Sequence, residues 1–413
     1  MMAMDGKQNM GNDVTLPEGW RLESIGGTCQ ILPGYGFPKS LQGSTKGSIP
    51  FYKVGDISAN VKSGARYLES CENYVDSNAL STLKAKLLPP NSIVFAKIGE
   101  GLKLNRRAIT KLPSLIDNNA IGIKARNLVI DDLFLFHFLT TIKLEALSQA
   151  TTVPSVRKSD IENITIPLPP LPEQERIVSK IEELFSELEK GKEQILLARQ
   201  QLKTYRQAVL KWAFEGRLTN AEVEDGVLPE GWEWVKVENA AESLDNLRKP
   251  INKTERAKRV GTIPYYGANG RTGWINDYLF NEPLILVVED ETFTGRELPF
   301  SYKISGKSWV NNHAHILRAK ENCHIDFLNY QLAYYPFLPL TTGTTGRKKL
   351  TKKALMNAII KICPLPEQHR IVQEIESRLS VCNAMEATLA NSLAQAEVLR
   401  QSILKRAFEG RLV

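Results

Sequence analysis

The sequence predicts a mixed α/β protein in which one unit, a globular domain followed by a long helix, occurs twice. Two observations support this fold class. Short motifs return in the same order in both halves of the chain, and each half ends in a proline-free segment with helical periodicity. The repeated motifs are LPEGW at 16–20 and 228–232, PLPEQ at 170–174 and 364–368, and FEGRL at 214–218 and 408–412.

The motifs set the expected boundaries along the 413 residues. Short loops tolerate changes in length, so the two globular parts are free to diverge, whereas the segment from PLPEQ to FEGRL aligns without a gap. The expected parts are a disordered tail at 1–15, a first domain at 16–170, a first helix at 171–218, a linker at 219–227, a second domain at 228–363 and a second helix at 364–413.

Composition places the chain among soluble globular proteins. Hydrophobic residues make up 42% and charged residues 24%, no apolar run is long enough to span a membrane, and no secretory signal opens the sequence. The five cysteines form no C-x-x-C pair, so we expect a reducing cytoplasm rather than disulfides or a zinc ribbon. The net charge of +7 is compatible with nucleic-acid binding but does not establish it.

Within the globular parts, strand-like runs separated by turn residues are expected at 49–57, 91–99 and 118–125. Short helices are expected near the end of each domain, at 131–141 and 325–335, where apolar residues follow helical spacing.

The long segments carry apolar residues at alternating steps of three and four, which predicts that they pair as a coiled coil. The alternative is that each helix is amphipathic and packs on its own domain. Gly216 and Gly410, in the FEGRL motifs, suit the position that ends a helix. The predicted seam comprises Ile177, Ile181, Leu184, Leu188, Ile195, Leu202 and Val209 in the first helix and Ile371, Ile375, Leu379, Leu389, Leu393 and Ile403 in the second.

From Leu16 to Val413, this order of motifs resembles the specificity subunits of type I restriction–modification systems (the HsdS family). The resemblance implies that each globular part is a target recognition domain reading one half of a bipartite DNA sequence. It further implies that the helices pair antiparallel, hold the domains apart and set the unread spacer. The implied partners are double-stranded DNA, two methyltransferase subunits and motor-nuclease subunits, with no membrane. S-adenosylmethionine, ATP and Mg²⁺ would belong to those subunits, and this chain would carry no cofactor.

Two Thr-rich and basic loops are the expected phosphate contacts: residues 341–353 and the milder stretch 149–160. A solvated surface loop is the alternative for each. Asn118, Asn119, Asn311 and Asn312 occur at matching positions, which favours a role in the frame or at phosphate over base choice. The candidate DNA-binding residues are Lys97, Arg106, Arg107, Thr151, Thr152, Arg157 and Lys158 in the first domain and Arg271, Arg296, Asn312, Thr344, Thr345, Arg347, Lys348 and Lys349 in the second.

The sequence offers no recognisable catalytic set. It contains no N-P-P-Y or D-P-P-Y tetrapeptide of amino-methyltransferases, and the phosphate-loop-like SGKS at 305–308 has Ser301 where that motif requires glycine. His313 and His315 would share one face of a strand, but no further ligand clusters with them, so we expect no metal. We therefore expect a non-catalytic specificity subunit. The alternatives are a self-sufficient DNA methyltransferase or nuclease with atypical motifs, and a scaffold that does not read DNA.

Overall fold

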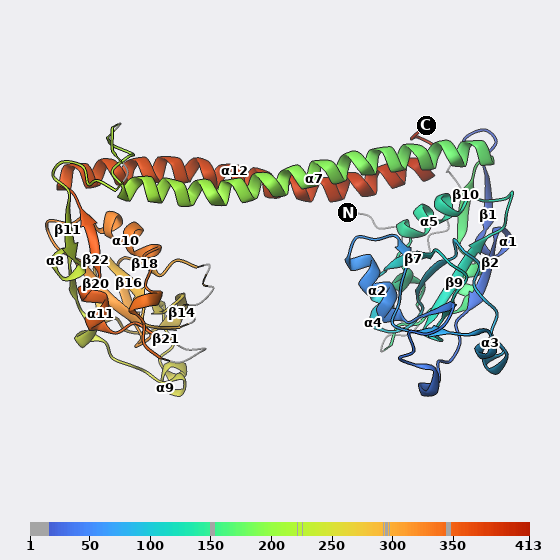
Figure 1. Ribbon diagram of the computed structural model, residues 1–413, viewed down its shortest axis with the longest axis horizontal. Helices are drawn as coiled ribbons and strands as arrows, with labels where there is room; N and C mark the ends of the chain where they lie inside the picture. Colours follow the sequence, from blue (N-terminus) through green and yellow to red (C-terminus); the bar gives the residue numbers. More distant parts are fainter. Residues whose placement is uncertain are drawn as a thin grey trace. The chain divides into compact units, whose positions relative to one another are not determined.

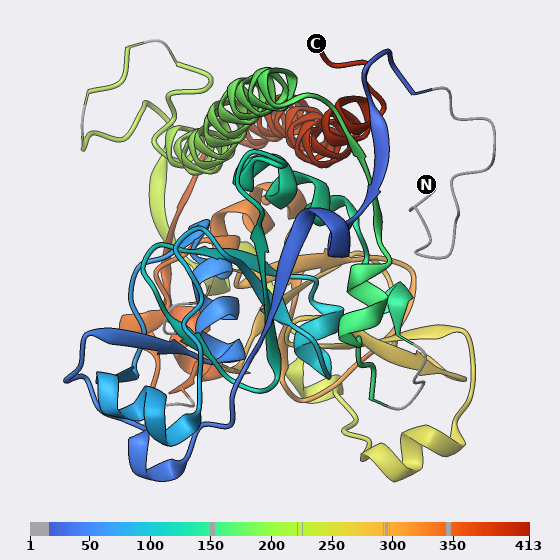
Figure 2. The same ribbon diagram turned by 90° about the vertical axis from the view of Figure 1, so that its right-hand side faces the viewer.

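The computed structural model describes residues 16–413 except 149–152, 221, 225, 292, 294–295, 297 and 344–347 (Figures 1 and 2). The expected tail at 1–15 lies outside the described residues. Contacts divide the chain into two units, each with one globular domain and parts of two long helices. Unit 1 runs to Ile195 and resumes at Asn391, and unit 2 is Leu196–Ala390.

Domain 1 of unit 1 contains two sheets and a separate two-stranded ribbon. The larger sheet has the order β2 (Cys29–Pro33), β9 (Ala120–Ala125), β6 (Ile93–Ala96), β7 (Arg107–Thr110) and β4 (Tyr67–Leu68). The smaller sheet is β5 (Tyr74–Val75), β3 (Ile49–Tyr52) and β8 (Leu115–Ile116), and the ribbon is β1 (Arg21–Ser24) with β10 (Thr165–Leu168). The helices are α1 (Ile25–Thr28), α2 (Val54–Lys62), α3 (Ser77–Leu83), α4 (Glu100–Lys103), α5 (Asp132–Thr141) and α6 (Lys158–Glu162), with 3₁₀ turns η1 (Lys39–Leu41) and η2 (Leu144–Leu147).

Domain 2 of unit 2 has two four-stranded sheets. Their orders are β12 (Ala241–Ser243), β20 (Ala314–Ala319), β16 (Leu284–Val288), β18 (Ser301–Ile304), and β14 (Gly270–Ile275), β13 (Ile263–Gly267), β19 (Lys307–Val310), β15 (Phe280–Asn281). Two further strand pairs are β17 (Asp290–Glu291) with β21 (Lys348–Lys349) and β11 (Glu233–Lys236) with β22 (Ile359–Ile362). The helices are α8 (Val237–Ala240), α9 (Lys253–Lys258), α10 (Ile325–Ala333) and α11 (Lys352–Asn357), with 3₁₀ turns η3 (Asp245–Leu247) and η4 (Leu338–Leu340).

The repeat predicted from short motifs extends to the topology. The order β2-β9-β6-β7 in domain 1 corresponds to β12-β20-β16-β18 in domain 2, and the other sheet of each domain contains one parallel pair, β3 with β8 and β13 with β19. The register agrees as well, because Ala96 pairs with Ala120 and Val288 with Ala314. The two domains therefore share one frame, and the mixed α/β prediction is confirmed.

One expected strand is half helix. The run 49–57 forms β3 only as far as Tyr52 and then turns into α2. Asp56, in the first turn of α2, accepts a hydrogen bond of 2.7 Å from the backbone N–H of Lys53. This bond satisfies a backbone donor that a helix start leaves without an intrahelical partner, and so favours the helix over a longer strand.

Two 44-residue helices follow the domains, α7 (Leu171–Phe214) and α12 (Leu365–Phe408). In unit 1 they pair antiparallel, because Glu189 contacts Arg400 while Lys192, further along α7, contacts the earlier Glu397 on α12. In unit 2 Arg206 donates to Glu386 and to Asn383. The predicted helix pair is thus observed in both units.

The seam is not buried uniformly. Seam residues near the helix ends are buried because each end also packs on a domain: Phe408 of α12 meets Phe134 and Phe138 of α5 edge to face, with ring centroids 5.2 and 5.3 Å apart. The start of α7 packs on its own domain, because Ile177 and Ile181 share a core cluster with Phe134, whereas Phe408 of α12 packs on the domain of the other half. The alternative in which each helix packs only on its own domain therefore does not describe the structure. The buried seam residues are Ile177, Ile181, Leu202, Val209, Ile371, Ile375 and Ile403, and the half-buried ones are Leu184, Leu188, Ile195, Leu379, Leu389 and Leu393.

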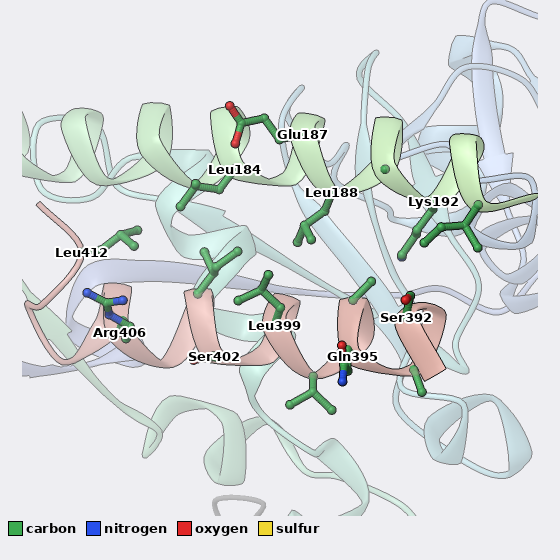
Figure 3. A pocket seen from close by; sticks show the side chains of 16 residues that line it. Leu184, Glu187, Leu188, Lys192, Ser392, Gln395, Leu399, Ser402, Arg406 and Leu412 are labelled. Carbon is green, nitrogen blue, oxygen red and sulfur yellow. The ribbon is translucent and has the colours of Figure 1, made fainter. Parts of the chain in front are cut away.

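Where the seam is half-buried in unit 1, the helix pair leaves an apolar groove of about 940 Å³. Figure 3 shows Leu184 and Leu188 pointing from α7 toward α12, and Leu399 pointing back toward α7. Gly191 contributes no side chain to this stretch, and Val398 and Leu399 of α12 remain exposed.

The repeated PLPEQ motif joins each long helix to its domain through a fully buried glutamine. The side-chain nitrogen of Gln174 donates to the carbonyls of Pro169 (2.8 Å) and Val129 (3.2 Å), and its oxygen accepts from the backbone N–H of Asp131 (2.8 Å). Asp131 in turn caps α5.

Gln368 makes the same three contacts in unit 2. It donates to Cys363 and Asn322 and accepts from the N–H of His324, the residue that precedes α10. Each glutamine thus fixes the start of a long helix against the start of a domain helix.

The other two repeated motifs meet one another. Gly216 and Gly410 follow the helix ends with φ of +79° and +68°, as the sequence predicts for a helix-ending glycine. A Cβ at Gly410 would lie 2.2 Å from Cγ of Pro17, and a Cβ at Gly216 would lie 2.3 Å from Cγ of Pro229. Each FEGRL therefore rests on an LPEGW motif within its own unit.

Candidate nucleic-acid interface

Most of the candidate DNA-binding residues that the structure describes lie where the central strand of each domain ends. In domain 1, the N–H of Lys97, directly after β6, donates to the carbonyl of Asn119 (2.8 Å), and its carbonyl accepts from Val156 (2.9 Å). In domain 2, Glu289 follows β16 and makes the same two bonds, to His313 (3.1 Å) and from Leu350 (2.8 Å).

These bonds bring three loops together in each domain. We call the three loops of a domain, taken together, its loop end. The loop end comprises residues 97–99, 117–119 and 153–158 in domain 1, and residues 289–291, 311–313 and 348–351 in domain 2. The backbone arrangement is shared, whereas the side chain at its centre is a lysine in one domain and a glutamate in the other.

The loop end of domain 1 exposes positive charge. Arg157 and Lys158 are exposed at the start of α6, next to the half-buried Lys97. Arg106 lies at the same end of the sheet because the residue after it, Arg107, pairs with Phe95 on β6. The backbone bond between Lys97 and Val156 therefore brings Lys97 next to Arg157 and Lys158, and the ammonium of Lys158 lies 3.4 Å from a carboxylate oxygen of Glu162.

The structure corrects the prediction that Arg107 binds DNA. Its side chain is only 5% exposed, and its guanidinium donates to Asn105 and to the carbonyl of Ile142. Burial lowers the pKa of Arg107, since removing a cation from water disfavours the charged form. A residue held in this way supports the domain and presents no charge to a ligand.

In domain 2 the candidates lie on neighbouring segments. Asn312 and Arg271 are exposed, the latter stacked on the ring of Trp274 at 4.2 Å. Arg296 is half-buried and donates to Asn269 in the β13–β14 turn (2.8 Å) and to the carbonyl of Pro299. Arg296 therefore ties the loop after β17 to the hairpin that carries Arg271.

Lys348 and Lys349 form β21, which pairs with β17. The ammonium of Lys349 lies 3.2 Å from a carboxylate oxygen of Glu289, so part of its charge is already engaged within the domain. Thr151, Thr152, Thr344, Thr345 and Arg347, the remaining candidates, lie outside the described residues.

A buried charge network supports the loop end of domain 2. Arg248 contacts Glu289 and Asp245, and His315 donates from Nε2 to the carbonyl of Leu350 (2.8 Å) while its Nδ1 faces Asp245 at 2.5 Å. Burial disfavours the charged form of Asp245, but His315, the N–H of Ile316 and Arg248 outweigh it and lower the pKa of Asp245. The network fixes the backbone from which Lys349 projects.

The two histidines that raised the question of a metal face different carboxylates. His313 contacts Asp290 at 2.7 Å and His315 contacts Asp245. In the described part of the chain, no group of three or more His, Cys, Asp or Glu side chains is arranged to hold a metal ion. No described helix is long and apolar enough to cross a membrane.

Sequence reasoning missed two features. One is the pair of buried glutamines, for which the repetition of PLPEQ was the available signal. The other is the stretch 248–259, with six basic residues and one acidic residue, none of which is among the candidate DNA-binding residues.

Comparison with known proteins decides the family. The family model of the type I restriction modification DNA specificity domain matches residues 17–198 and again 229–395, so both halves of the chain carry it. The chain belongs to this family. Among specificity subunits, the chain is 24% identical to that of the Escherichia coli K12 type I enzyme EcoKI, over 96% of this chain and 90% of the relative. It is 26% identical to the specificity subunit of E. coli EcoDI, over 65% of this chain and 67% of the relative.

Solved structures of type I systems share the fold of this specificity-domain chain. A chain from a study of complex assembly and conformational transition of a type I R-M system aligns with a TM-score of 0.71 and 22% identity, covering 96% of this chain and 99% of that one. The HsdS subunit from Thermoanaerobacter tengcongensis aligns with a TM-score of 0.61 and 21% identity, covering 97% and 99%.

Proposed function

We propose that this chain is the DNA-binding specificity subunit of a type I restriction–modification complex and that each domain reads one half of a bipartite target. The observation that carries the proposal is the double occurrence of one specificity domain, with the same strand order and different loop ends. A shared frame with divergent surfaces suits two half-sites of different sequence, since groove contacts choose bases while the frame sets position.

At each loop end and in the neighbouring hairpin of β14, exposed and half-buried cations would contact phosphates. Lys97, Arg157 and Lys158 serve domain 1, and Arg271 and Lys348 serve domain 2. Lysine and arginine supply the charge that orients a protein on the duplex, whereas base choice would come from side chains that differ between the domains, such as His313, which takes the position of Asn119. Arg106 and Arg296, both half-buried, would contribute mainly by holding these segments.

The paired helices would set the length of the unread spacer and bind two methyltransferase subunits. The exposed apolar groove beside Leu188 and Leu399 supports a protein contact, because a contiguous apolar surface of this kind is costly to leave in water (Figure 3). Motor-nuclease subunits would complete the complex. Methyl transfer and cleavage, with S-adenosylmethionine, ATP and Mg²⁺, would then be carried out by these partners.

A domain graft tests the proposal. Residues 16–170 are replaced by the corresponding residues of another family member, and the methylated sequence is determined in a host that also expresses the methyltransferase subunit. We expect one half of the recognised sequence to change and the other half to stay. A chimera that assembles but alters both halves would refute independent reading, and methylation by the purified chain alone would support an enzyme instead.

A further inference from the structure

The stretch 248–259, here called the basic arm, is a concentration of positive charge that the proposed function does not yet use. It contains six basic residues and one acidic residue, and it leads from η3 into α9. Figure 1 shows α9 near β14 and β21, at the end of domain 2 opposite the long helices.

Three of the six cations hold the arm against domain 2. Arg248 donates to the carbonyl of Ala314 (3.0 Å) and contacts Glu289, which joins the arm to the loop end. The guanidinium of Arg256 lies 4.7 Å from the ring centre of Tyr265, and that of Arg259 lies 4.9 Å from the ring centre of Trp309.

The backbone of the arm is tied down as well. The indole N–H of Trp309 donates to the carbonyl of Lys249 at 3.0 Å, and the side chain of Asn252 caps α9 by accepting from the N–H of Glu255. The two cation–π contacts add to this attachment, because the ring face attracts the guanidinium. The arm is therefore positioned by its own domain before any partner arrives.

The other three cations, Lys249, Lys253 and Lys258, are exposed. None of them forms an ion pair with a described residue, in contrast to Lys236 and Lys303 of the same domain, which face Glu238 and Asp326. Three unpaired ammonium groups within ten residues repel one another, and a polyanion would relieve that repulsion.

We infer that the basic arm binds the phosphodiester backbone of duplex DNA beside the half-site read by domain 2; this rests on the proposed function. Lysine ammonium groups are compact point charges that suit phosphate oxygens, and phosphate contacts position a protein without choosing bases, so the arm adds affinity rather than sequence choice. Since the arm is already fixed, little conformational entropy is lost when it meets the DNA.

The test compares wild type with the triple variant Lys249→Gln, Lys253→Gln, Lys258→Gln, as full chains assembled with the methyltransferase subunits. Dissociation constants for a duplex with the recognised sequence are measured between 50 and 200 mM salt. Each lost phosphate contact reduces the magnitude of the negative slope of log K against log salt by about 0.9. We therefore expect this magnitude to fall by about 2–3 and binding to weaken at least tenfold at low salt. The methylated sequence is expected to stay the same.

The matched control is Lys236→Gln, Lys303→Gln, Lys320→Gln, which removes the same net charge from lysines that already have partners in the domain. Equal slopes for wild type and the arm variant, or equal decreases in arm and control variants, would overturn the inference. So would a changed methylated sequence, which would mean base reading, or loss of a methyltransferase subunit at an unchanged slope, which would mean a protein partner. Failure of the wild type to select its sequence would instead refute the proposed function.

Discussion

Replacing Gln174 by leucine tests whether the repeated glutamine couples each long helix to its domain. Leucine keeps the approximate volume but removes both donors and the acceptor. The buried N–H of Asp131 and the carbonyls of Pro169 and Val129 then lose the partners that lie 2.8–3.2 Å away. An orphaned buried polar group costs about 1–3 kcal/mol, and the added apolar burial returns part of that, so we expect a net loss of about 2–4 kcal/mol.

For a unit of this size, a loss of that magnitude lowers the melting temperature by about 5–15 °C. Calorimetry of the full chain measures it, with Gln368→Leu as the equivalent change in unit 2 and Gln201→Leu, at an exposed position of α7, as the control. The control should shift the transition by less than about 2 °C, because surface substitutions usually change stability by under 0.5 kcal/mol. If Gln174→Leu and Gln368→Leu melt together with the control, the three hydrogen bonds do not couple helix and domain.

Three further outcomes are expected. Gly216→Ala and Gly410→Ala should each destabilise by about 1–3 kcal/mol, because a Cβ there meets a proline ring at positive φ, while Gly191→Ala, with open space in mid-helix, should stabilise by about 0.5–1 kcal/mol; equal melting temperatures for all three would contradict this. Burial disfavours the charged form of Glu182, but His137 and Arg66 outweigh the effect of burial and lower the pKa of Glu182 to about 2. The ionised Glu182 therefore stabilises the folded state at neutral pH, and this stabilisation is lost as pH falls from 4.5 toward 2. Glu182→Gln should therefore cost about 1–2 kcal/mol at pH 7, after allowance for its 36% exposure, and the difference from wild type should shrink toward pH 3 in paired melting curves. Inserting four residues at 195/196 in α7 and four at 390/391 in α12 adds about 6 Å to each helix, so the spacer in the methylated sequence should grow by about one or two base pairs; an unchanged spacer with full activity would mean that the helices do not set it.

The architecture could be predicted from the sequence because its motifs are repeated and the apolar residues of its long helices are periodic. The paired motifs predicted two equivalent halves, and the three-and-four spacing from Ile177 to Val209 predicted the helix pair. The predicted strand at 49–57 is too long, because apolar alternation cannot reveal that the side chain of Asp56 accepts a hydrogen bond from the backbone N–H of Lys53 and so starts a helix there. Sequence patterns thus predicted the elements whose formation depends on residues close to one another in the chain.

Site residues were harder to predict, because charge alone does not indicate burial. Arg106 and Arg107 are adjacent in sequence, yet Arg107 is enclosed by Asn105 and Ile142. The role of Gln174 likewise depends on Val129 and Asp131, more than forty positions earlier, a contact that exists only after folding. Tertiary enclosure decides which polar residues serve the frame.

The position shared by Lys97 and Glu289 has a consequence for how such a chain evolves. Both residues are held through their main-chain N–H and carbonyl, so the bonds that fix this position do not require any particular side chain. At Lys97 a point mutation could therefore change charge or size and leave these backbone bonds in place, whereas at Glu289 it would also remove the buried side-chain contacts with Arg248 and Lys349. The backbone frame that the two domains share can thus stay constant while the side chain that it presents varies.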